Sequence, residues 1–323
     1  MSALRICITA ILALAAGSSA LAAVAAHGGR FSLRLDVLTH FAPVYLAVGL
    51  IAALGGLALG RAGLFPVVVP AFIAIAASVA LIAPEFVYAR APMAKAKGAT
   101  LTIVQFNAWG GNRKPTAAAD WLLAQNADVI VMEEGHHIGQ VLVSRGGYQR
   151  ICGACSANIY SRLKPIADNS PRHGDHRRRP FSAATLVGVG GPFTVMGVHR
   201  AWPTRLAKQR DQAALLQEVV AGYPRERLII AGDFNSTPWS FARRREDRAL
   251  GLVRRTRALF TWPAERVSHN RLPALFPILP IDHVYAGSGW ATVAVRRGPR
   301  LGSDHYPVVV TLAPAAQSLR TSR

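Results

Sequence analysis

Three long stretches without a charged side chain lie within the first 85 positions, and they constrain the fold more than any other feature of the sequence. They cover residues 6–26, 41–60 and 62–84, and each is at least 20 residues long. A helix of about 20 apolar residues crosses roughly 30 Å of hydrocarbon with all its backbone hydrogen bonds satisfied internally. We therefore predict a membrane region over residues 1–90 with about three transmembrane helices.

The first stretch has two other interpretations, a cleaved signal peptide and a buried soluble helix. Ala20-Leu21-Ala22 is compatible with a cleavage site, but the apolar core of a signal peptide spans only about 7–15 residues. Two further apolar stretches follow in series, which favours a retained helix. We expect a multi-pass integral protein of a bacterial inner membrane, with cleavage of the first stretch left open.

Charge is distributed unevenly along the chain, whose formal net charge is +20. Up to Lys97 there are seven basic and two acidic residues, and the remainder holds 30 basic and 15 acidic ones. The basic tracts 172–179 and 243–248 suit nucleic-acid backbone, anionic lipid headgroups or a solvated surface. With 51% hydrophobic residues and three cysteines, the chain is neither disordered nor a disulfide-rich miniature fold.

The side of the membrane on which the C-terminal part lies stays open. Counting basic residues around three spans places that part in the cytoplasm, because five of the seven flank its side. The pair Cys152 and Cys155 fits a disulfide in an oxidising compartment, or a metal site or free thiols in a reducing one.

After a predicted linker over 91–99, strands and helices alternate from residue 100 to 313, ahead of a tail over 314–323. Helices are expected over 115–125 and 205–220, where apolar residues recur at helical spacing. Short apolar runs predict the strands, which cover 101–106, 128–132, 185–189, 193–198, 228–231, 283–285 and 307–312. Many short strands with fewer helices over some 200 residues indicate a layered α/β or α+β sandwich.

Polar residues stand where these strands begin or end. Such positions gather side chains at one rim of a sheet, where layered folds place their chemistry. The residues concerned are Asn107, Glu133, Glu134, His199, Asp233, Asn235, Asp282, His283, Asp304 and His305. Carboxylate and amide oxygens suit Mg²⁺ or Mn²⁺ better than Zn²⁺. Histidines beside such a cation supply what metal-assisted hydrolysis of a phosphate ester needs.

The motifs that carry these residues resemble the endonuclease/exonuclease/phosphatase superfamily in order and spacing, over about residues 100 to 313. They are Gln105–Trp109, Asp128–Glu134, Tyr160–Arg162, Val198–His199, Gly232–Pro238, Ile281–His283 and Ser303–Pro307. The resemblance implies a four-layered α/β sandwich with two packed mixed β-sheets and a divalent-metal phosphoesterase activity.

For metal binding, the resemblance implies that Glu134 is the principal ligand, that Asn107 contacts the metal or the phosphate, and that Asp304 is a candidate second ligand. Glu133 stands where many relatives have Gln. Two adjacent glutamates therefore compete for the ligand role, and strand alternation would point only one of them inward.

For catalysis, the resemblance implies that Asp233 and Asn235 orient the attacking water or the leaving group, Asn235 also binding a phosphoryl oxygen. His305 is similar to the catalytic histidine, with Asp282 as the carboxylate that fixes its tautomer. His199 resembles a second histidine that donates to phosphate or acts as a general acid.

The expected function is therefore membrane-anchored, Mg²⁺- or Mn²⁺-dependent hydrolysis of phosphodiesters or phosphomonoesters, nuclease-like in character. One alternative is a phospholipid or phosphoinositide hydrolase of sphingomyelinase type, and a further one is a catalytically inactive, membrane-tethered binding module. The expected partners are a nucleic acid, phospholipid or inositol phosphate, and the lipid bilayer. Four other histidines, His136, His137, His173 and His176, are expected in solvated loops.

Overall fold

The computed structural model describes residues 2–87, 91, 93–95, 98–152, 155–170, 180–265 and 273–315. The chain divides into two compact units. The helical unit comprises Met1–Tyr88 together with Ser236–Arg245, and the second unit comprises Ala89–Asn235 together with Glu246–Arg323. The chain therefore passes between the two units at three places, two of which flank the segment Ser236–Arg245.

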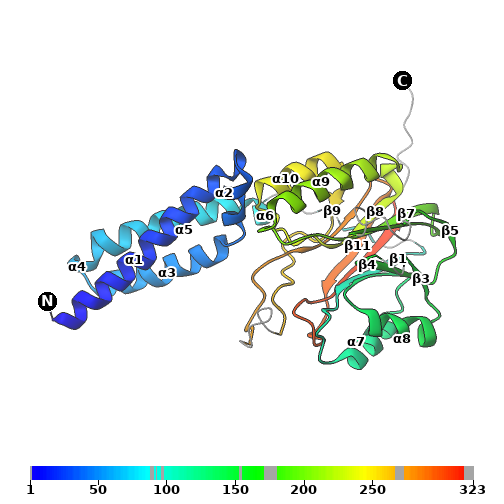
Figure 1. Cartoon of the computed structure of the whole chain (residues 1–323), viewed down its shortest axis with the longest axis horizontal. Coiled ribbons are helices and arrows are strands. Elements are labelled where there is room, and N and C mark those ends of the chain that lie inside the picture. Colours follow the sequence, from blue (N-terminus) through cyan, green and yellow to red (C-terminus); the bar gives the residue numbers. More distant parts are fainter. Residues whose placement is uncertain are drawn as a thin grey trace, which may run out of the picture. The chain divides into compact units, whose positions relative to one another are not determined.

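The helical unit contains long apolar helices (Figure 1). Its elements are α1 (Ala3–Ala26), η1 (His27–Arg30), α2 (Leu33–Thr39), α3 (Ala42–Ala58), α4 (Arg61–Gly63), η2 (Leu64–Val68), α5 (Val69–Ile82) and α6 (Pro84–Val87). Two continuous helical stretches, Ala3–Arg30 and Arg61–Val87, are long and apolar enough to cross a membrane. The pair α2 and α3, bent by 54°, makes a third candidate if it counts as one span.

Small residues form the contacts inside the helical unit, and large apolar ones face outward. Ala16, Ala52 and Ala71 are buried where the helices meet, whereas Leu14 and Leu21 are 73% and 74% exposed. Small residues at helix contacts and exposed leucines are typical of helices that pack in lipid. This pattern suggests membrane association.

The second unit is built on two six-stranded sheets. The first sheet has the order β11-β12-β1-β2-β4-β3 and the second β5-β6-β7-β8-β10-β9. The strands of the first sheet are β1 (Leu101–Asn107), β2 (Val129–Glu133), β3 (Gln149–Ile151), β4 (Ala157–Ser161), β11 (Trp290–Arg297) and β12 (Val308–Pro314). Those of the second are β5 (Pro165–Asp168), β6 (Phe181–Gly188), β7 (Gly191–His199), β8 (Leu228–Asp233), β9 (Val253–Arg254) and β10 (Asp282–Ala286).

Both sheets are mixed and pack face to face. β1 runs parallel to β2 but antiparallel to β12, and β8 runs parallel to β7 but antiparallel to β10. The core between the sheets takes Ile103 and Val131 from one and Val195 and Ile229 from the other. Helices α7 (Pro115–Ala124) and α8 (His136–Gly146) cover the outer face of the first sheet, and α9 (Leu206–Ala221) covers that of the second. The predicted sandwich of two packed mixed sheets is confirmed.

One local expectation from the sequence is wrong, and one alternative left open for a basic tract does not hold for a residue within it. His136 and His137 are exposed, but they lie in the first turn of α8 rather than in a loop, because Ile138 and Leu142, four residues apart, bury one helix face. The interpretation of the basic tract 243–248 as a solvated surface does not hold for Arg243, because its side chain is buried in α10 (Phe241–Leu250). Residues 171–179, with His173, His176 and the first basic tract, lie outside the described residues.

Cys152 and Cys155 form a disulfide, which decides between the alternatives that the sequence left open for this pair. The bridge lies just before β4, and Cys155 Sγ also lies 3.1 Å from the carbonyl oxygen of Phe181 on β6. The remaining cysteine, Cys7, is free and exposed in α1.

Candidate active site

The strand register brings the predicted polar residues to one rim of the sandwich. In the first sheet Asn107 is paired with Glu133 at the ends of the parallel strands β1 and β2. In the second sheet Asp233 lies between His199 of β7 and Asp282 of β10. Because parallel strands end at the same edge of a sheet, residues far apart in the sequence become neighbours.

Asp233, Asp282 and His305 form the buried centre of the site. Their ligand atoms lie within 4.8 Å of one another, and all three residues are buried. His305 Nδ1 lies 2.8 Å from Asp282 Oδ2, and His305 Nε2 lies 3.7 Å from Asp233 Oδ2. The imidazole ring is thus held between two carboxylates, with its Nδ1 side fixed by Asp282.

Two asparagines orient the carboxylate of Asp233. The side-chain amides of Asn107 and Asn235 both donate to Asp233 Oδ2 at 3.1 Å, and the Asn235 backbone N–H donates to Oδ1 at 2.8 Å. Asn235 adopts a left-handed φ of 49°, and its amide also donates to the Arg200 carbonyl at 2.9 Å. Asn is one of the few residues besides Gly that adopt left-handed backbone readily, because its short polar side chain can hydrogen-bond locally.

The turn Gly232–Asn235, at the end of β8, packs closely against the backbone of β7. A Cβ on Gly232 would lie 1.8 Å from the carbonyl oxygen of Val198, which no side chain can accept. Gly232 is therefore needed directly before Asp233, because it lets the end of β8 approach the end of β7 beside His199.

The electrostatics of the buried centre follow from burial and mutual charge. Burial raises the pKa of the Asp233 carboxyl to about 7, although His305 and the asparagine donors act against it. Burial on its own lowers the pKa of His305, but the carboxylates of Asp282 and Asp233 outweigh it and raise that pKa to about 10. Burial would also raise the pKa of Asp282, yet the charge and hydrogen bond of His305 hold it below its usual value.

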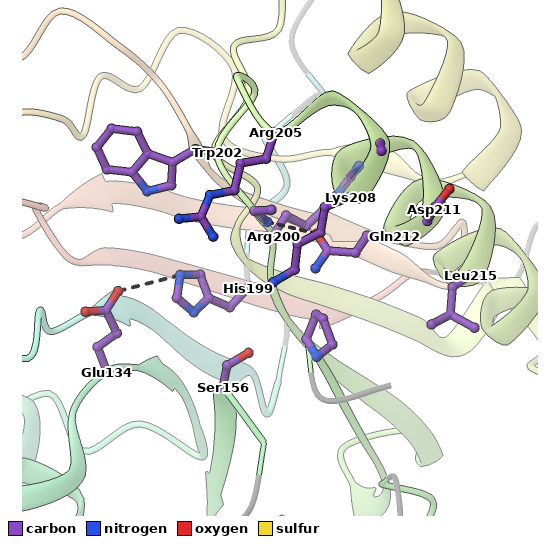
Figure 2. A pocket seen from close by; sticks show the side chains of 13 residues that line it. Glu134, Ser156, His199, Arg200, Trp202, Arg205, Lys208, Asp211, Gln212 and Leu215 are labelled. Carbon is purple, nitrogen blue, oxygen red and sulfur yellow. Dashed lines mark hydrogen bonds and ion pairs between the residues drawn. The ribbon is translucent and has the colours of Figure 1, made fainter. Parts of the chain in front are cut away.

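Glu134 and His199 face each other at the entrance to the site. Figure 2 shows the two side chains joined across 3.6 Å between Glu134 Oε1 and His199 Nε2. They line a pocket of about 870 Å³ whose wall continues along the start of α9, where Trp202, Arg205 and Lys208 lie. Burial lowers the pKa of His199, even though Glu134 favours its protonated form.

Comparison with known proteins identifies the family. A model of the endonuclease/exonuclease/phosphatase family matches residues 104–305, which include every predicted site residue. The chain belongs to this family. Members of the endonuclease/exonuclease/phosphatase family are phosphoester hydrolases, so the chain is a hydrolase by class.

Solved structures share the fold. A family protein from Bacteroides thetaiotaomicron aligns over 68% of this chain and 100% of its own, at 17% identity and a TM-score of 0.51. D. rerio TDP2 complexed with single-strand DNA product aligns over 67% of this chain and 99% of its own, at 16% identity and a TM-score of 0.53. A mannosyl-6-phosphatase of Bacteroides thetaiotaomicron aligns over 66% of this chain and 99% of its own, at 17% identity and a TM-score of 0.50. No curated protein sequence matches significantly.

The two adjacent glutamates are placed differently. Glu133 is fully buried and accepts a hydrogen bond from Gln105 Nε2 at 3.0 Å. Glu134 has a left-handed φ of 54°, its side chain is 39% exposed and it lines the pocket. The chain turns directly after β2, so this turn, as well as strand alternation, separates the two carboxylates. Glu134, and not Glu133, therefore lines the pocket, and the ligand role of Glu134 stays a prediction.

Gln105 is a site residue whose role the sequence reasoning missed. Its side-chain amide bridges Glu133 Oε2 and Asp282 Oδ1, at 3.0 and 2.9 Å. A buried amide inside the apolar run Thr102–Phe106 was the available signal, because such a group has to find hydrogen-bond partners. Burial raises the pKa of Glu133 well above its usual value, and the carboxylates of Asp282 and Asp233 raise it further.

Asp304 lies next to His305, but it is not brought into the buried three-residue group. Among the residues that the structure describes, that group comprises Asp233, Asp282 and His305. Asp304 Oδ2 instead accepts from Trp262 Nε1 at 3.3 Å, and its charge favours the protonated form of His305. Its role as a second metal ligand stays a prediction.

The donor set fits a hard divalent cation. Asp233 and Asp282 supply carboxylate oxygens within one group, which in the described part of the chain also includes His305 but neither Glu133 nor Glu134. Glu133 Oε1 is buried and has no hydrogen-bond partner among the described residues. Burial raises the pKa values of Asp233 and Glu133, and the neighbouring carboxylates raise them further by repulsion. A divalent cation with oxygen ligands would relieve this repulsion, as the chemistry of Mg²⁺ and Mn²⁺ requires.

Proposed function

We propose that the chain is a membrane-anchored, divalent-metal-dependent phosphoesterase that acts on phosphodiesters or phosphomonoesters, with a nuclease-like preference. The observation that carries the proposal is the convergence of Asp233, Asp282 and His305 with two asparagines at the rim that Glu134 and His199 line. With Mg²⁺ or Mn²⁺ bound, through Glu134 and Asn107 as the principal candidates, the cation would polarise a phosphoryl oxygen and offset its growing charge.

The protein's own groups then divide the work of proton transfer and charge stabilisation. Asp233, with a pKa of about 7, is suited to accept a proton from the attacking water. His305 holds a proton at Nδ1 towards Asp282, which leaves Nε2–H to donate towards a phosphoryl or leaving oxygen. Asn107 and His199 would supply further donors for the phosphoryl oxygens, where preorganised hydrogen bonds act most strongly in the transition state. Both N–H groups of the Asn235 amide are engaged by Asp233 and the Arg200 carbonyl, so Asn235 would have to release one of them to bind a phosphoryl oxygen.

The pocket supports a nucleic acid as substrate. Arg205 and Lys208 lie one turn apart at the start of α9, and Trp202 is 55% exposed beside them. Cationic side chains attract the phosphates next to a scissile bond, and an exposed indole stacks on an unpaired base. A single strand can offer both groups together, and the TDP2 structure of the same fold contains single-strand DNA product.

A phospholipid hydrolase of sphingomyelinase type is the second candidate. The observation in its favour is the pair of helices long enough to span a membrane, which would keep the enzyme at a lipid surface. The same helices support an integral membrane location, and a multi-pass location in an inner membrane is part of our proposal. A catalytically inactive binding module is disfavoured by the full set of carboxylates, amides and histidines at the rim.

Substrate profiling of the purified full chain in lipid nanodiscs tests the proposal. With Mn²⁺, we expect cleavage of single-stranded oligonucleotides and of bis(p-nitrophenyl) phosphate, and little release of headgroups from sphingomyelin. The variant Arg205→Ala should raise KM for the oligonucleotide about tenfold and leave bis(p-nitrophenyl) phosphate unaffected. Lys164→Ala, an exposed cation outside the pocket, is the matched control. Preferred hydrolysis of sphingomyelin would overturn the nuclease-like assignment, and no hydrolysis of any phosphoester would overturn the enzymatic one.

A further inference from the structure

The helical unit contains a buried polar face that the hydrolytic chemistry does not use. Asp36 and Thr39 in α2 and His40 just after it are spaced at i, i+3 and i+4, so they lie on one side of the helix. All three are buried, at 3%, 0% and 7% exposure. Asp36 is one of two acidic residues before position 97, and a carboxylate among apolar helices is costly unless it is fully hydrogen-bonded.

The partner of this polar face is the segment Ser236–Arg245, which belongs to the same unit although it lies about 200 positions later. Asp36 Oδ2 accepts from Ser240 Oγ at 2.7 Å and from the Ala242 N–H at 3.0 Å, while Oδ1 accepts from the Phe241 N–H at 2.8 Å. Ser240 Oγ in turn accepts from the Arg243 N–H at 3.1 Å. Asp36 and Ser240 together satisfy the first three N–H groups of α10, which have no partner within the helix itself.

Two further contacts hold the chain just before α10. Thr237 is bound to His40 Nδ1 through its hydroxyl at 2.8 Å and its N–H at 3.2 Å. Trp239 Nε1 donates to the Thr39 carbonyl at 2.9 Å. Thr237, Trp239 and Ser240 are all at most 1% exposed. The segment is therefore embedded in the helical unit by directed hydrogen bonds and does not merely rest on its surface.

The embedded segment begins immediately after the turn Gly232–Asn235, called the catalytic turn below because it carries Asp233 and Asn235. Asn235, whose amide and backbone N–H both hold Asp233, is followed directly by Ser236, and Thr237 is already bound to His40. Asn235, with its left-handed φ, lies between two sets of contacts. On one side these are Asp233 and the Arg200 carbonyl; on the other, the chain is fixed by the polar face of α2.

We infer that Asp36 is a positioning residue for the catalytic turn: by anchoring the start of α10 on the helical unit, it fixes the course of the chain that leaves Asn235. The inference rests on the proposed function, since it assigns Asn235 a place in hydrolysis. It means that the apolar helices contribute to turnover as well as to anchoring. Asp36 touches no substrate, and its effect on catalysis passes through Ser240, Thr237 and Asn235.

The variants Asp36→Asn and Ser240→Ala, alone and together, test the inference in the full chain in nanodiscs. Asparagine keeps the shape of Asp36 but offers one acceptor oxygen where three donors converge. With Mn²⁺ and bis(p-nitrophenyl) phosphate, we expect Asp36→Asn to lower kcat about tenfold and leave KM within about twofold. A displacement of a catalytic group by a full 1 Å costs about 100-fold. The double variant should be no slower than Asp36→Asn alone, because both changes break one linkage.

Two matched controls separate positioning from a loss of folding. Asp168→Asn alters a carboxylate that also accepts a backbone N–H, from Ser170 at 2.9 Å, but far from α10 in the sequence. Ser78→Ala removes a buried hydroxyl from the same helical unit. Both should keep wild-type kcat, and all variants are assayed well below their own Tm. Wild-type kcat in Asp36→Asn, or an equal fall in Ser78→Ala, would overturn the inference.

Hydrogen exchange of the peptides covering 233–245 supplies a readout that does not depend on activity. In Asp36→Asn, the amides of Asn235, Phe241 and Ala242 should exchange at least tenfold faster than in the wild type. If the wild type hydrolyses no phosphoester, the proposed function fails, and exchange at Asn235 alone decides the inference. Faster exchange there supports the linkage, and unchanged exchange overturns it.

Discussion

Replacing Asp282 with Asn should cost most of the activity while leaving the fold in place. Both Asp282 oxygens accept from donors, Oδ2 from His305 Nδ1 at 2.8 Å and Oδ1 from Gln105 Nε2 at 2.9 Å. An asparagine has one acceptor oxygen, so one donor must face its NH₂ group. Breaking a buried charged pair costs about 3–5 kcal/mol, and each 1.4 kcal/mol is a factor of ten. Because the protonated His305 needs this partner during the reaction, a loss of that size in the transition state lowers kcat/KM roughly 100- to 4000-fold. The same change lowers Tm, so the variant is assayed well below its own Tm.

The assay is Mn²⁺-dependent hydrolysis of bis(p-nitrophenyl) phosphate by the full chain, with Tm measured alongside. Asp120→Asn is the control, because its ion pair with Arg145 at 3.0 Å joins side chains that are more than half exposed and contributes little. More than half of the wild-type kcat/KM in Asp282→Asn, measured well below its own Tm, would refute the argument that this carboxylate holds His305 in its working state.

Three further predictions concern the buried glutamate, the histidine and the disulfide. Glu133→Gln should keep at least a third of wild-type kcat, because burial and the neighbouring carboxylates raise the pKa of Glu133 and so disfavour its charged form, and glutamine still accepts from Gln105; a 100-fold loss would show that its charge is needed. In EDTA, the folded-state pKa of His305, about 10 against 6.5, contributes stability that is complete below about pH 6.5 and is lost as pH rises towards 10. This stability is on the order of a few kcal/mol, so Tm should fall between about pH 6.5 and 10, and His305→Gln should make that fall smaller. Parallel curves of Tm against pH for the wild type and the variant would count against this assignment. The Cys152–Cys155 disulfide predicts that the catalytic unit lies on the oxidising side of the membrane. In spheroplasts that carry a variant without Cys7, a membrane-impermeant maleimide should label the protein only after treatment with a membrane-impermeant reductant. Labelling without reduction would contradict this.

The rim of polar residues was predictable because strand order and strand ends are local properties of the sequence. The largely apolar run Leu101–Phe106 leads directly to Asn107, and the apolar run Leu228–Ala231 leads through Gly232 to Asp233. Once the strands lie in packed sheets, those residues share an edge, and the register places Asn107 beside Glu133 and His199 beside Asp233. The fold class and the gathering of candidates therefore follow from patterns of a few residues.

Features that depend on a turn or on distant partners were not predictable in the same way. The separation of Glu133 from Glu134 comes from a left-handed residue after β2, and strand alternation alone does not say where a strand bends. The burial of Arg243 and the role of Asp36 depend on contact between segments about 200 positions apart. No local pattern encodes such a pairing, although a lone acid among apolar helices signals that some partner exists.

The central claim is that this rim hydrolyses phosphoesters with a divalent cation, and a metal titration of the purified full chain tests it most directly. Hydrolysis of bis(p-nitrophenyl) phosphate should vanish in excess EDTA, return on addition of Mn²⁺ or Mg²⁺, and stay absent in Asp233→Asn at any metal concentration. Hydrolysis that persists in EDTA, or that Asp233→Asn retains in full, would contradict the account.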